Sequence, residues 1–312
     1  MAKKMLFLFV LLLSLTGMLK AQVTTAGMSG KVMADEESVI GATVVAVHEP
    51  SGTSYGTVTN VDGRFSLQGM RSGGPYKVTV SYIGYQTAIY TDIQLQLGET
   101  YSLNVTLHEA SELLGEITIT ASKSKFSAEK TGATTNISSE QLTTLPSINR
   151  SISDFTRISP YASGNNFGGR DGRSNTFTVD GANLNNNFGL SSNLPGGGNP
   201  ISLDAIDEVQ VVIAPYDVRQ ANFIGAGINA ITKSGTNAYR GSAYMYFNNE
   251  VMRGNKIGNT DFGARAEESK TVYGATLGGP IIKDKLFFFA NVEYEKSPQQ
   301  VVKWRAAQEG ET

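Results

Sequence analysis

Cysteine is absent from this sequence of 312 residues, and histidine occurs only at His48 and His108. A chain without cysteine forms no disulfides, no thiolate metal sites and no cysteine nucleophile. A hydrolytic zinc site needs about three ligands around one ion with an open position, and neither histidine has a His-x-x-Glu spacing. We therefore assign no catalytic residue, no metal ligand and no cofactor, and we expect both histidines at strand ends on the surface.

Charged residues are also scarce, at 17% of the chain against about 25% in average soluble proteins. The net charge is −2 and no basic block occurs, which argues against nucleic acid as a partner. Glycine is abundant, because 34 of the 312 residues are glycine, which is above the usual share of about 7%. Together with the many Asn, Ser and Thr residues, this composition is typical of turn-rich β structure and of few long helices.

The N-terminus has the layout of a secretory signal peptide. Lys3 and Lys4 precede an apolar run from Met5 to Leu15, and small and polar residues follow. The run is shorter than the roughly 20 helical residues that cross a bilayer. We predict a signal peptide over residues 1–21 and export of the chain; a buried N-terminal helix is the alternative.

Residues 23–109 contain short β-like runs separated by Gly, Asp, Asn and Pro. The runs are KVMA, GATVVAVH, SYGTVT, GRFSLQG, YKVTVSYI, TAIYTDIQL and TYSLNVTLH. This spacing predicts a compact antiparallel sandwich, with a tight turn at Asp62-Gly63 because glycine tolerates positive φ. The expected core residues are Val44, Val47, Phe65, Val78 and Val80.

Three of these stretches resemble a known family. GATVVAV, TVTNVDGRFSLQG and YKVTVSYIGYQT are similar to the carboxypeptidase regulatory-like domain, which implies a transthyretin-type sandwich. Despite the family's name the resemblance implies no peptidase, because this sequence lacks the ligands for a hydrolytic metal.

Two glycine-rich patterns in the middle of the chain invite a nucleotide interpretation. NFGGRDGRSNTFTVDG, residues 166–181, lacks the Gly-Lys-Ser/Thr of a P-loop, and Gly225 to Ala230 fits G-x-G-x-x-A. A dinucleotide fingerprint opens a helix directly after a strand, whereas here Gly235 follows within a turn-like Lys-Ser-Gly-Thr-Asn. We therefore interpret these glycines as sites of close backbone packing and tight bends.

The surrounding sequence predicts a mixture of short helices and buried strands. Ser138-Ser139 can cap a helix that runs to Leu145 and stops at Pro146. SISDFTRIS predicts another short amphipathic turn, and AIDEVQVVIAPYDV predicts a buried strand.

The order of these pieces resembles the plug domain of TonB-dependent outer-membrane receptors, and most closely its Oar-like branch. The matching motifs are ITITAS, SISDFTRISP, GGRDGRSNTFTVDG, ISLDAIDEVQVVIAPYDVRQ and GAGINAITKSGTN. The resemblance implies a plug domain over residues 123–237 in which Phe177 and Val179 face the core and Asp180-Gly181 forms a turn. It implies a structural role for the motif residues Gly169, Arg170, Gly172, Arg173, Asp180 and Gly181.

Two features of this segment have alternative interpretations. Arg170 and Arg173 either pair with acidic groups of the plug or barrel wall, or remain solvated. The loop from Asn185 to Asn199 either contacts substrate or is a passive solvated loop.

Residues 115–122, GEITITAS, alternate Ile and Thr after an acidic residue. Such a strand adds readily to an exposed sheet edge, although an ordinary linker strand has the same pattern. The resemblance implies a TonB-box-like segment that pairs through its backbone with a TonB-type periplasmic energy-coupling protein. Its residues are Glu116, Ile117, Thr118, Ile119, Thr120 and Ala121.

Residues 238–312 contain strands with aromatic ends: AYRGSAYMYFN, TVYGATLGG and KLFFFANVEYE. In the last of these, Ala290, Val292 and Tyr294 alternate with Asn291, Glu293 and Glu295. This is the alternation of transmembrane β-strands, which face lipid on one side and the lumen on the other, although a soluble sandwich strand also alternates. A long polar connection followed by the short Lys283–Lys285 turn matches the order of external loops and periplasmic turns. Since a transporter barrel takes roughly 22 strands, we expect the chain to be a fragment, a truncated gene product or the first section of a longer protein.

The predicted fold is mainly β: a transthyretin-like β-sandwich, an α+β plug domain, and the first strands of an outer-membrane β-barrel. The predicted function is the N-terminal portion of a TonB-dependent outer-membrane receptor or transporter with plug gating, located in the outer membrane with its sandwich in the periplasm. Its partners would be the energy-coupling protein, outer-membrane lipid and an unknown external substrate. The alternative is a secreted or periplasmic adhesion or binding protein, and a third possibility, the regulatory module of a hydrolase, requires a catalytic domain that this sequence lacks.

Overall fold

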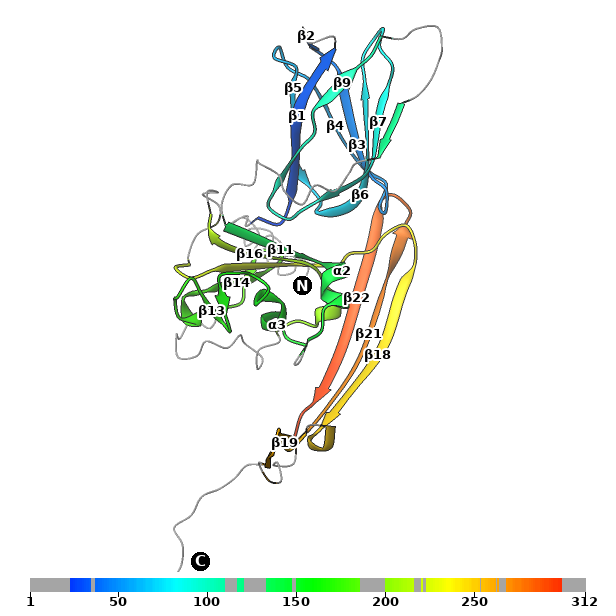
Figure 1. Ribbon diagram of the computed structural model, residues 1–312. Coiled ribbons are helices and arrows are strands. Elements are labelled where there is room, and N and C mark those ends of the chain that lie inside the picture. The colour runs from blue at the N-terminus through cyan, green and yellow to red at the C-terminus, as the bar shows by residue number, and fades with distance from the viewer. Residues whose placement is uncertain are drawn as a thin grey trace, which may run out of the picture. The chain divides into compact units, whose positions relative to one another are not determined.

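The computed structural model divides into two compact units, residues 1–233 and 234–312 (Figure 1), which are considered separately below. The predicted signal peptide and most of the Asn185–Asn199 loop lie outside the residues that the structure describes. In residues 117–120 only the backbone is described. The described residues are 23–34, 37–109, 117–120, 133–147, 150–185, 200–215, 220, 223–252, 254–261, 263 and 268–298.

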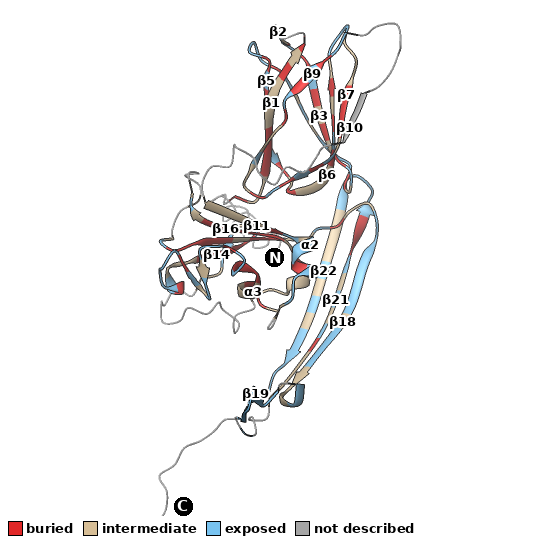
Figure 2. Ribbon diagram, in the orientation of Figure 1, coloured by how far each residue is buried: buried red, intermediate tan, exposed pale blue. Residues whose placement is uncertain are grey.

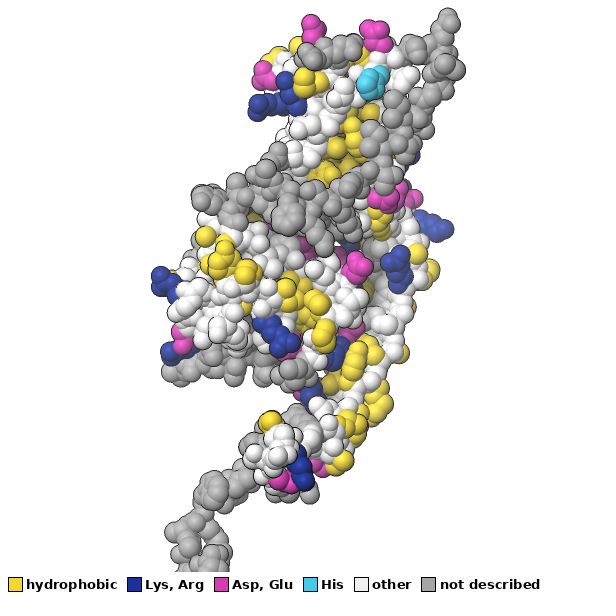
Figure 3. Space-filling view, in the orientation of Figure 1, with side chains coloured by type: hydrophobic (Ala, Val, Ile, Leu, Met, Phe, Trp, Pro, Cys, Tyr) yellow, Lys and Arg dark blue, Asp and Glu magenta, His cyan; other side chains and the backbone are white. Residues whose placement is uncertain are grey.

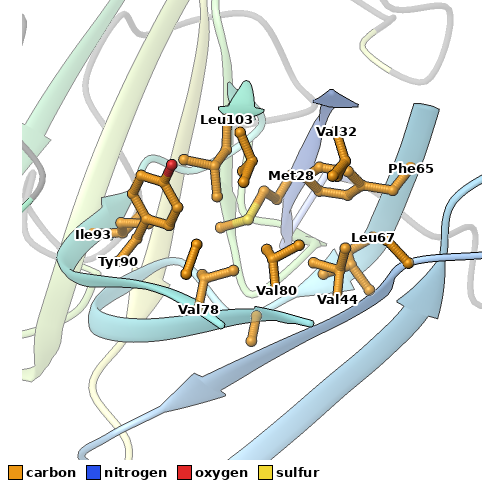
Figure 4. Close-up of a cluster of buried hydrophobic side chains, with 14 of the residues drawn as sticks. Met28, Val32, Val44, Phe65, Leu67, Val78, Val80, Tyr90, Ile93 and Leu103 are labelled. Atoms are coloured by element: carbon orange, nitrogen blue, oxygen red, sulfur yellow. The ribbon is translucent and has the colours of Figure 1, made fainter. Parts of the chain in front are cut away.

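The first unit begins with the predicted β-sandwich, which is not wholly antiparallel as expected, because β1 has two parallel partners. In one sheet β1 (Ala26–Ala34) is central, antiparallel to β2 (Glu37–Ser38) and β5 (Arg64–Met70) and parallel to β8 (Thr100–Ser102) and β9 (Val105–Leu107). The other sheet has the order β10 (Ile117–Thr120), β7 (Ala88–Leu95), β6 (Gly73–Ser81), β3 (Thr43–His48) and β4 (Thr53–Val58). Side chains from both sheets fill the space between them, as Met28 and Val32 of β1 and Val78 and Val80 of β6 illustrate (Figure 4).

The pleat of β3 confirms part of the predicted core and corrects the rest. Val44, Phe65, Val78 and Val80 are buried as predicted. Val47 was expected in the core but is only half-buried, because Ala46 and His48 on either side of it point inward. Since successive side chains of a strand face opposite sides, His48 is buried rather than at the surface, whereas His108 is exposed as expected.

The Asp62-Gly63 turn also forms as predicted. The side-chain oxygen of Asn60 accepts hydrogen bonds from the N–H groups of Asp62 (3.0 Å) and Arg64 (2.8 Å). Gly63 has φ +72°, and a Cβ there would lie 2.7 Å from the carbonyl oxygen of Val32. Both the backbone conformation and the space therefore require glycine.

A second sheet follows in the same unit, and residues 133–233 are called the middle domain here. Its strand order is β11 (Ala133–Ser138), β16 (Ile206–Ala214), β17 (Gly227–Thr232), β14 (Thr176–Val179) and β15 (Ala182–Asn183). α2 (Ser139–Thr144) and α3 (Ile152–Thr156) contribute Leu142, Ile152 and Phe155 to its core. The short elements are η2 (Gly172–Ser174), η3 (Leu203–Ala205), β12 (Ala162–Ser163) and β13 (Asn166–Phe167).

The local signals of the middle domain are confirmed. Ser138 caps α2 through a capping box with Gln141, and the helix ends at the cap residue Leu145, before Pro146. The G-x-G-x-x-A pattern leads into strand β17 and not into a helix. Its first two glycines pack tightly, because a Cβ on Gly225 would lie 2.3 Å from the Asn175 side chain and one on Gly227 2.7 Å from the Phe223 ring.

The second unit is an antiparallel sheet with the order β18 (Arg240–Asn249), β21 (Ser269–Ile282) and β22 (Leu286–Lys296). Its strands are largely exposed, in contrast to the buried strands of the sandwich (Figure 2). η4 (Glu250–Met252), β19 (Lys256–Ile257) and β20 (Thr260–Asp261) lie in the connection from β18 to β21. The Lys283–Lys285 turn joins β21 to β22 with Asp284 at φ 60°. Within the described residues no helix is long and apolar enough to span a membrane.

Candidate functional site

The glycine-rich stretch from Asn166 to Gly181 is a rigid loop followed by a buried strand. Gly168 and Gly169 have positive φ values of 57° and 75°, and the side chain of Asn166 accepts the N–H of Gly172 at 2.8 Å. Gly172 is buried at the start of η2, whose N-cap is Asp171. These conformations and contacts explain why glycine occurs at these positions, as expected for tight bends.

The two arginines of this loop are both exposed. Arg173 donates to the carboxylate of Asp171 at 2.9 Å, with exposed side-chain fractions of 53% and 54%. The bonds from Arg173 hold the pKa of Asp171 below its usual value. Arg173 thus pairs within its own loop, and an exposed pair of this kind adds little stability.

The turn at the end of the stretch ties two strands of the middle domain together. Asp180 and Gly181 have φ values of 47° and 82°, as in the turns that favour Asp-Gly. The Asp180 carboxylate accepts the N–H of Thr232 at 2.9 Å and its hydroxyl at 2.7 Å. Phe177 and Val179, which precede the turn, are buried in the core as predicted.

Asn185, the first residue of the predicted substrate loop, has a structural role. Its side-chain oxygen accepts the N–H of Phe177 at 2.6 Å, and its amide donates to the Thr176 hydroxyl at 3.3 Å. This holds the beginning of the loop against β14.

The sequence reasoning missed a contact between the sandwich and the middle domain, which we call the Leu97 junction. Both oxygens of the Glu208 carboxylate accept the N–H of Leu97 at 3.1 Å. The carbonyl of Leu97 accepts the side-chain amides of Asn136, at 3.3 Å, and Gln210. Leu97 is fully buried, and a Cβ on the next residue, Gly98, would lie 2.8 Å from the Gln210 amide. The junction therefore joins one sandwich loop to neighbouring strands of the middle sheet.

Burial sets the electrostatics of the junction. Glu208 is 7% exposed, and burial raises its pKa to about 7, with the neighbouring Asp207 charge adding to the shift. Burial also raises the pKa of Asp207. The signal in the sequence was the pair of carboxylates and Gln210 within the otherwise apolar run IDEVQVVIA, since buried polar side chains require specific partners.

The predicted TonB-box-like segment is a strand in its described part. Ile117 to Thr120 form β10, which pairs in parallel with Ala88 to Thr91 of the sandwich strand β7. Glu116 and Ala121 lie outside the described residues. The segment thus adds to a sheet edge within its own chain.

The sheet of β18, β21 and β22 has one apolar and one polar face. Large apolar side chains on one face are between 49% and 71% exposed, and hydrophobic groups run along these strands in the space-filling view (Figure 3). They are Met245, Phe247, Tyr273, Leu277, Val292 and Tyr294.

The opposite face carries polar contacts between strands of the sheet. The hydroxyl of Tyr244 donates to Glu293 at 2.7 Å across Gly274, and Lys270 pairs with Glu295 at 3.0 Å. Gly274 makes room for the ring, because a Cβ there would lie 2.1 Å from Tyr244. Exposed apolar groups on one face and polar groups on the other are the pattern of strands in a membrane barrel.

Comparison with known proteins agrees with this pattern. Residues 27–108 match the family model of the carboxypeptidase regulatory-like domain, and residues 231–304 match that of an outer membrane beta barrel domain. The TonB-dependent transporter Oar of Myxococcus xanthus is 27% identical over 252 residues, which are 75% of this chain and 23% of that protein. The chain therefore spans less than a quarter of the length of this relative.

Two solved structures match parts of this chain at low similarity. The siderophore receptor PirA from Acinetobacter baumannii is 23% identical with a TM-score of 0.40, over 53% of this chain and 24% of that one. A cohesin–X-dockerin complex from Acetivibrio cellulolyticus is 20% identical with a TM-score of 0.22, over 26% of this chain and 56% of that one. Neither likeness is close enough to bear on function.

The sandwich, the two-faced sheet and the two family models define an outer-membrane β-barrel protein with an N-terminal carboxypeptidase regulatory-like domain. Within that class the chain is similar to TonB-dependent transporters. Its location is the outer membrane, which disfavours the alternative of a secreted or periplasmic binding protein.

Proposed function

We propose that the chain is part of a TonB-dependent outer-membrane receptor or transporter. The middle domain acts as the plug of the barrel, and the sandwich lies in the periplasm. Residues 116–121 are the segment through which a TonB-type energy-coupling protein pulls. The observation that carries the proposal is the two-faced sheet of β18, β21 and β22, because a large exposed apolar face marks an interaction surface such as one that meets a membrane.

The strand order of the middle domain suggests how a pull would open the plug. β11 is the edge strand of its sheet and pairs with β16 alone among the described strands. It is also the first strand after the coupling segment in the chain. Within the middle domain, tension on residues 116–121 would therefore reach β11 first and unpair one edge strand before it disturbed the core. External substrate would favour release of the coupling segment to its partner.

The coupling role is tested by removing one backbone donor from the segment. We expect Ile119→Pro to reduce capture of the periplasmic coupling protein at least tenfold, because proline has no N–H for strand pairing. Ile119→Val keeps the backbone and the β propensity and is the matched control. Capture is measured by pull-down of the coupling protein's C-terminal domain with receptor from outer-membrane extracts. Equal capture by the two variants would contradict the role of this segment.

A further inference from the structure

One edge of the sandwich, along β7, has a short stretch of backbone that can pair with another strand. This stretch, Ala88 to Thr91, is called the slot here. Before the slot, the N–H of Gln86 donates to the carbonyl of His108 at 2.8 Å, and Tyr85 forms a bridge with Glu109. After the slot, Asp92 has φ 61°, a left-handed conformation that interrupts an extended edge. The edge that remains for another strand is thus bounded on both sides.

β10 fills this slot. Its residues pair in parallel, Ile117 with Ala88 through to Thr120 with Thr91, so that the ladder ends one residue before Asp92. All four residues of β10, Ile-Thr-Ile-Thr, are β-branched, and such residues favour extended structure. The length of the strand therefore matches the length of the free edge.

The chain itself keeps β10 near this edge. Glu109 is bridged to Tyr85, three positions before Ala88, and residues 110–116 join Glu109 to Ile117. A tether this short gives the strand an effective concentration in the millimolar range at the slot. A ladder of few hydrogen bonds can then be occupied at rest and still be reversible.

We infer that the edge of β7 is a resting seat for the coupling strand, and that the strand must leave it before a pull passes along the chain to β11. The inference rests on the proposed function. While β10 is seated, tension on it is carried by the sandwich, which is bound to β16 and β11 at the Leu97 junction by Glu208, Gln210 and Asn136. When β10 leaves the seat, tension passes along the chain to the edge strand β11. The sandwich thus decides which part of the middle domain bears the load.

The seat is tested by disulfide trapping, in which the two engineered cysteines are the only ones in this sequence. Thr118 and Ile89 are register partners, about 4.8 Å apart as neighbouring strands are, within the reach of a disulfide. The matched control joins Thr118 to Thr79, which pairs with Ile89 on its other side and so lies about 10 Å from β10. We expect oxidation of the native receptor in outer membranes to link Thr118→Cys/Ile89→Cys at least tenfold more than Thr118→Cys/Thr79→Cys.

A second pair of cysteines is needed because Ile89 is buried, so its replacement can impair folding. Thr120→Cys/Thr91→Cys lies in the same register, and Thr91 is only half-buried. Equal linkage of the register pairs and the control pair, read by mass spectrometry of the linked peptides, would overturn the seat.

The mechanical consequence is tested by pulling on the captured coupling-protein domain in a single-molecule force experiment. We expect the oxidised Thr120→Cys/Thr91→Cys receptor to lose the extension that accompanies release of β11, and reductant to restore it. Unchanged extension after oxidation would overturn the inference that the strand must leave the seat before tension reaches β11 along the chain. If unmodified receptor captures no coupling-protein domain, the proposed function fails, while the trapping yields still decide whether the seat exists.

Discussion

Glu208 and His48 are buried side chains whose pKa values move in opposite directions for the same reason. Burial penalises the charged form, so it raises the pKa of the carboxyl group to about 7 and lowers that of the imidazole to about 4. The charge of Arg71 adds to the shift of His48, whose Nδ1 lies 2.7 Å from the Ser51 hydroxyl. Neutral His48 and protonated Glu208 are therefore the forms that the fold favours.

The pH dependence of stability follows from the sign of the Glu208 shift. Its pKa is raised in the folded protein from 4.5 to about 7, so the folded state binds the proton more tightly. This contribution is full below about pH 4.5 and is lost as the pH rises through 7. We expect Glu208→Gln, which cannot ionise, to remove a decline of up to about 3 kcal/mol between pH 5 and 8. Urea unfolding followed by circular dichroism measures it.

His48 is present in both proteins, so its titration cancels in the comparison, whereas Asp207 is coupled to Glu208 and contributes to the measured difference. The two should differ in the pH dependence of their urea midpoints and not in the slope of unfolding. The same decline in both proteins would mean that burial does not hold Glu208 protonated.

Gly30 of β1 is the glycine with the least space around it among the described residues. A Cβ there would lie 1.8 Å from the carbonyl oxygen of Leu103, and this part of the backbone is held because the N–H of Leu103 donates to Ser29 at 2.8 Å. We expect Gly30→Ala to destabilise the sandwich by about 3 kcal/mol, at the upper end of overpacking costs. Thermal unfolding measures the loss. Gly56→Ala is the control, because the nearest atom to a Cβ at that strand position is 4.0 Å away, and a similar loss there would contradict the steric explanation.

At the scale of the elements, alternation gives each strand of the second unit its two faces. β22 places Val292 on the exposed apolar face and Asn291 on the polar face, one residue apart. Their partners on β21, Ala275 and Thr276, have the same character. The orientation of a single residue therefore decides whether it meets lipid.

A charge on each face tests this assignment. We expect Val292→Lys to cost about 2–4 kcal/mol, the cost of a lysine facing lipid near the bilayer midplane, and to reduce folded protein in the outer membrane severalfold. Asn291→Lys, the neighbouring control, should leave it near the unmodified level. Heat-modifiable gel mobility of outer-membrane fractions measures the folded share. Equal losses for both variants would show that β22 does not face lipid with its apolar side.

At the scale of the whole molecule, the proposed function places the sandwich and the long β18–β21 connection on opposite sides of the outer membrane. Both regions offer exposed positions for labelling: Val61 in a sandwich turn is 74% exposed, and Asn259 lies exposed between β19 and β20. The absence of cysteine makes a single engineered thiol the only one in this sequence.

We expect Asn259→Cys to react with a membrane-impermeant maleimide in intact cells. Val61→Cys should react only after the outer membrane is permeabilised, because the periplasm is closed to the reagent. The extent of labelling is read on gels of the purified protein. Labelling of Val61→Cys in intact cells, at the rate of Asn259→Cys, would contradict the periplasmic position of the sandwich.

Local chemistry alone accounts for much of this architecture. Three features depend on residues only a few positions apart: the capping box of Ser138, the Asp180-Gly181 turn, and the alternation of Val292 with its neighbours. Both a helix cap and a two-residue alternation can be recognised in the sequence. Val47 shows the limit of such reasoning, because a run of Thr-Val-Val-Ala-Val-His is apolar on both faces and does not disclose which one is buried.

Contacts between distant segments depend instead on how the chain is brought together. Leu97 and Glu208 are 111 positions apart, and although a carboxylate in an apolar run requires a partner, the sequence does not show that the partner is Leu97. The free edge of β7 is limited to a few residues because Gln86 is already bonded to His108 and Asp92 has a left-handed conformation within the strand. Backbone groups at such an edge accept any extended strand, so the sequence shows that residues 117–120 are extended, and only the fold provides the edge on which they lie.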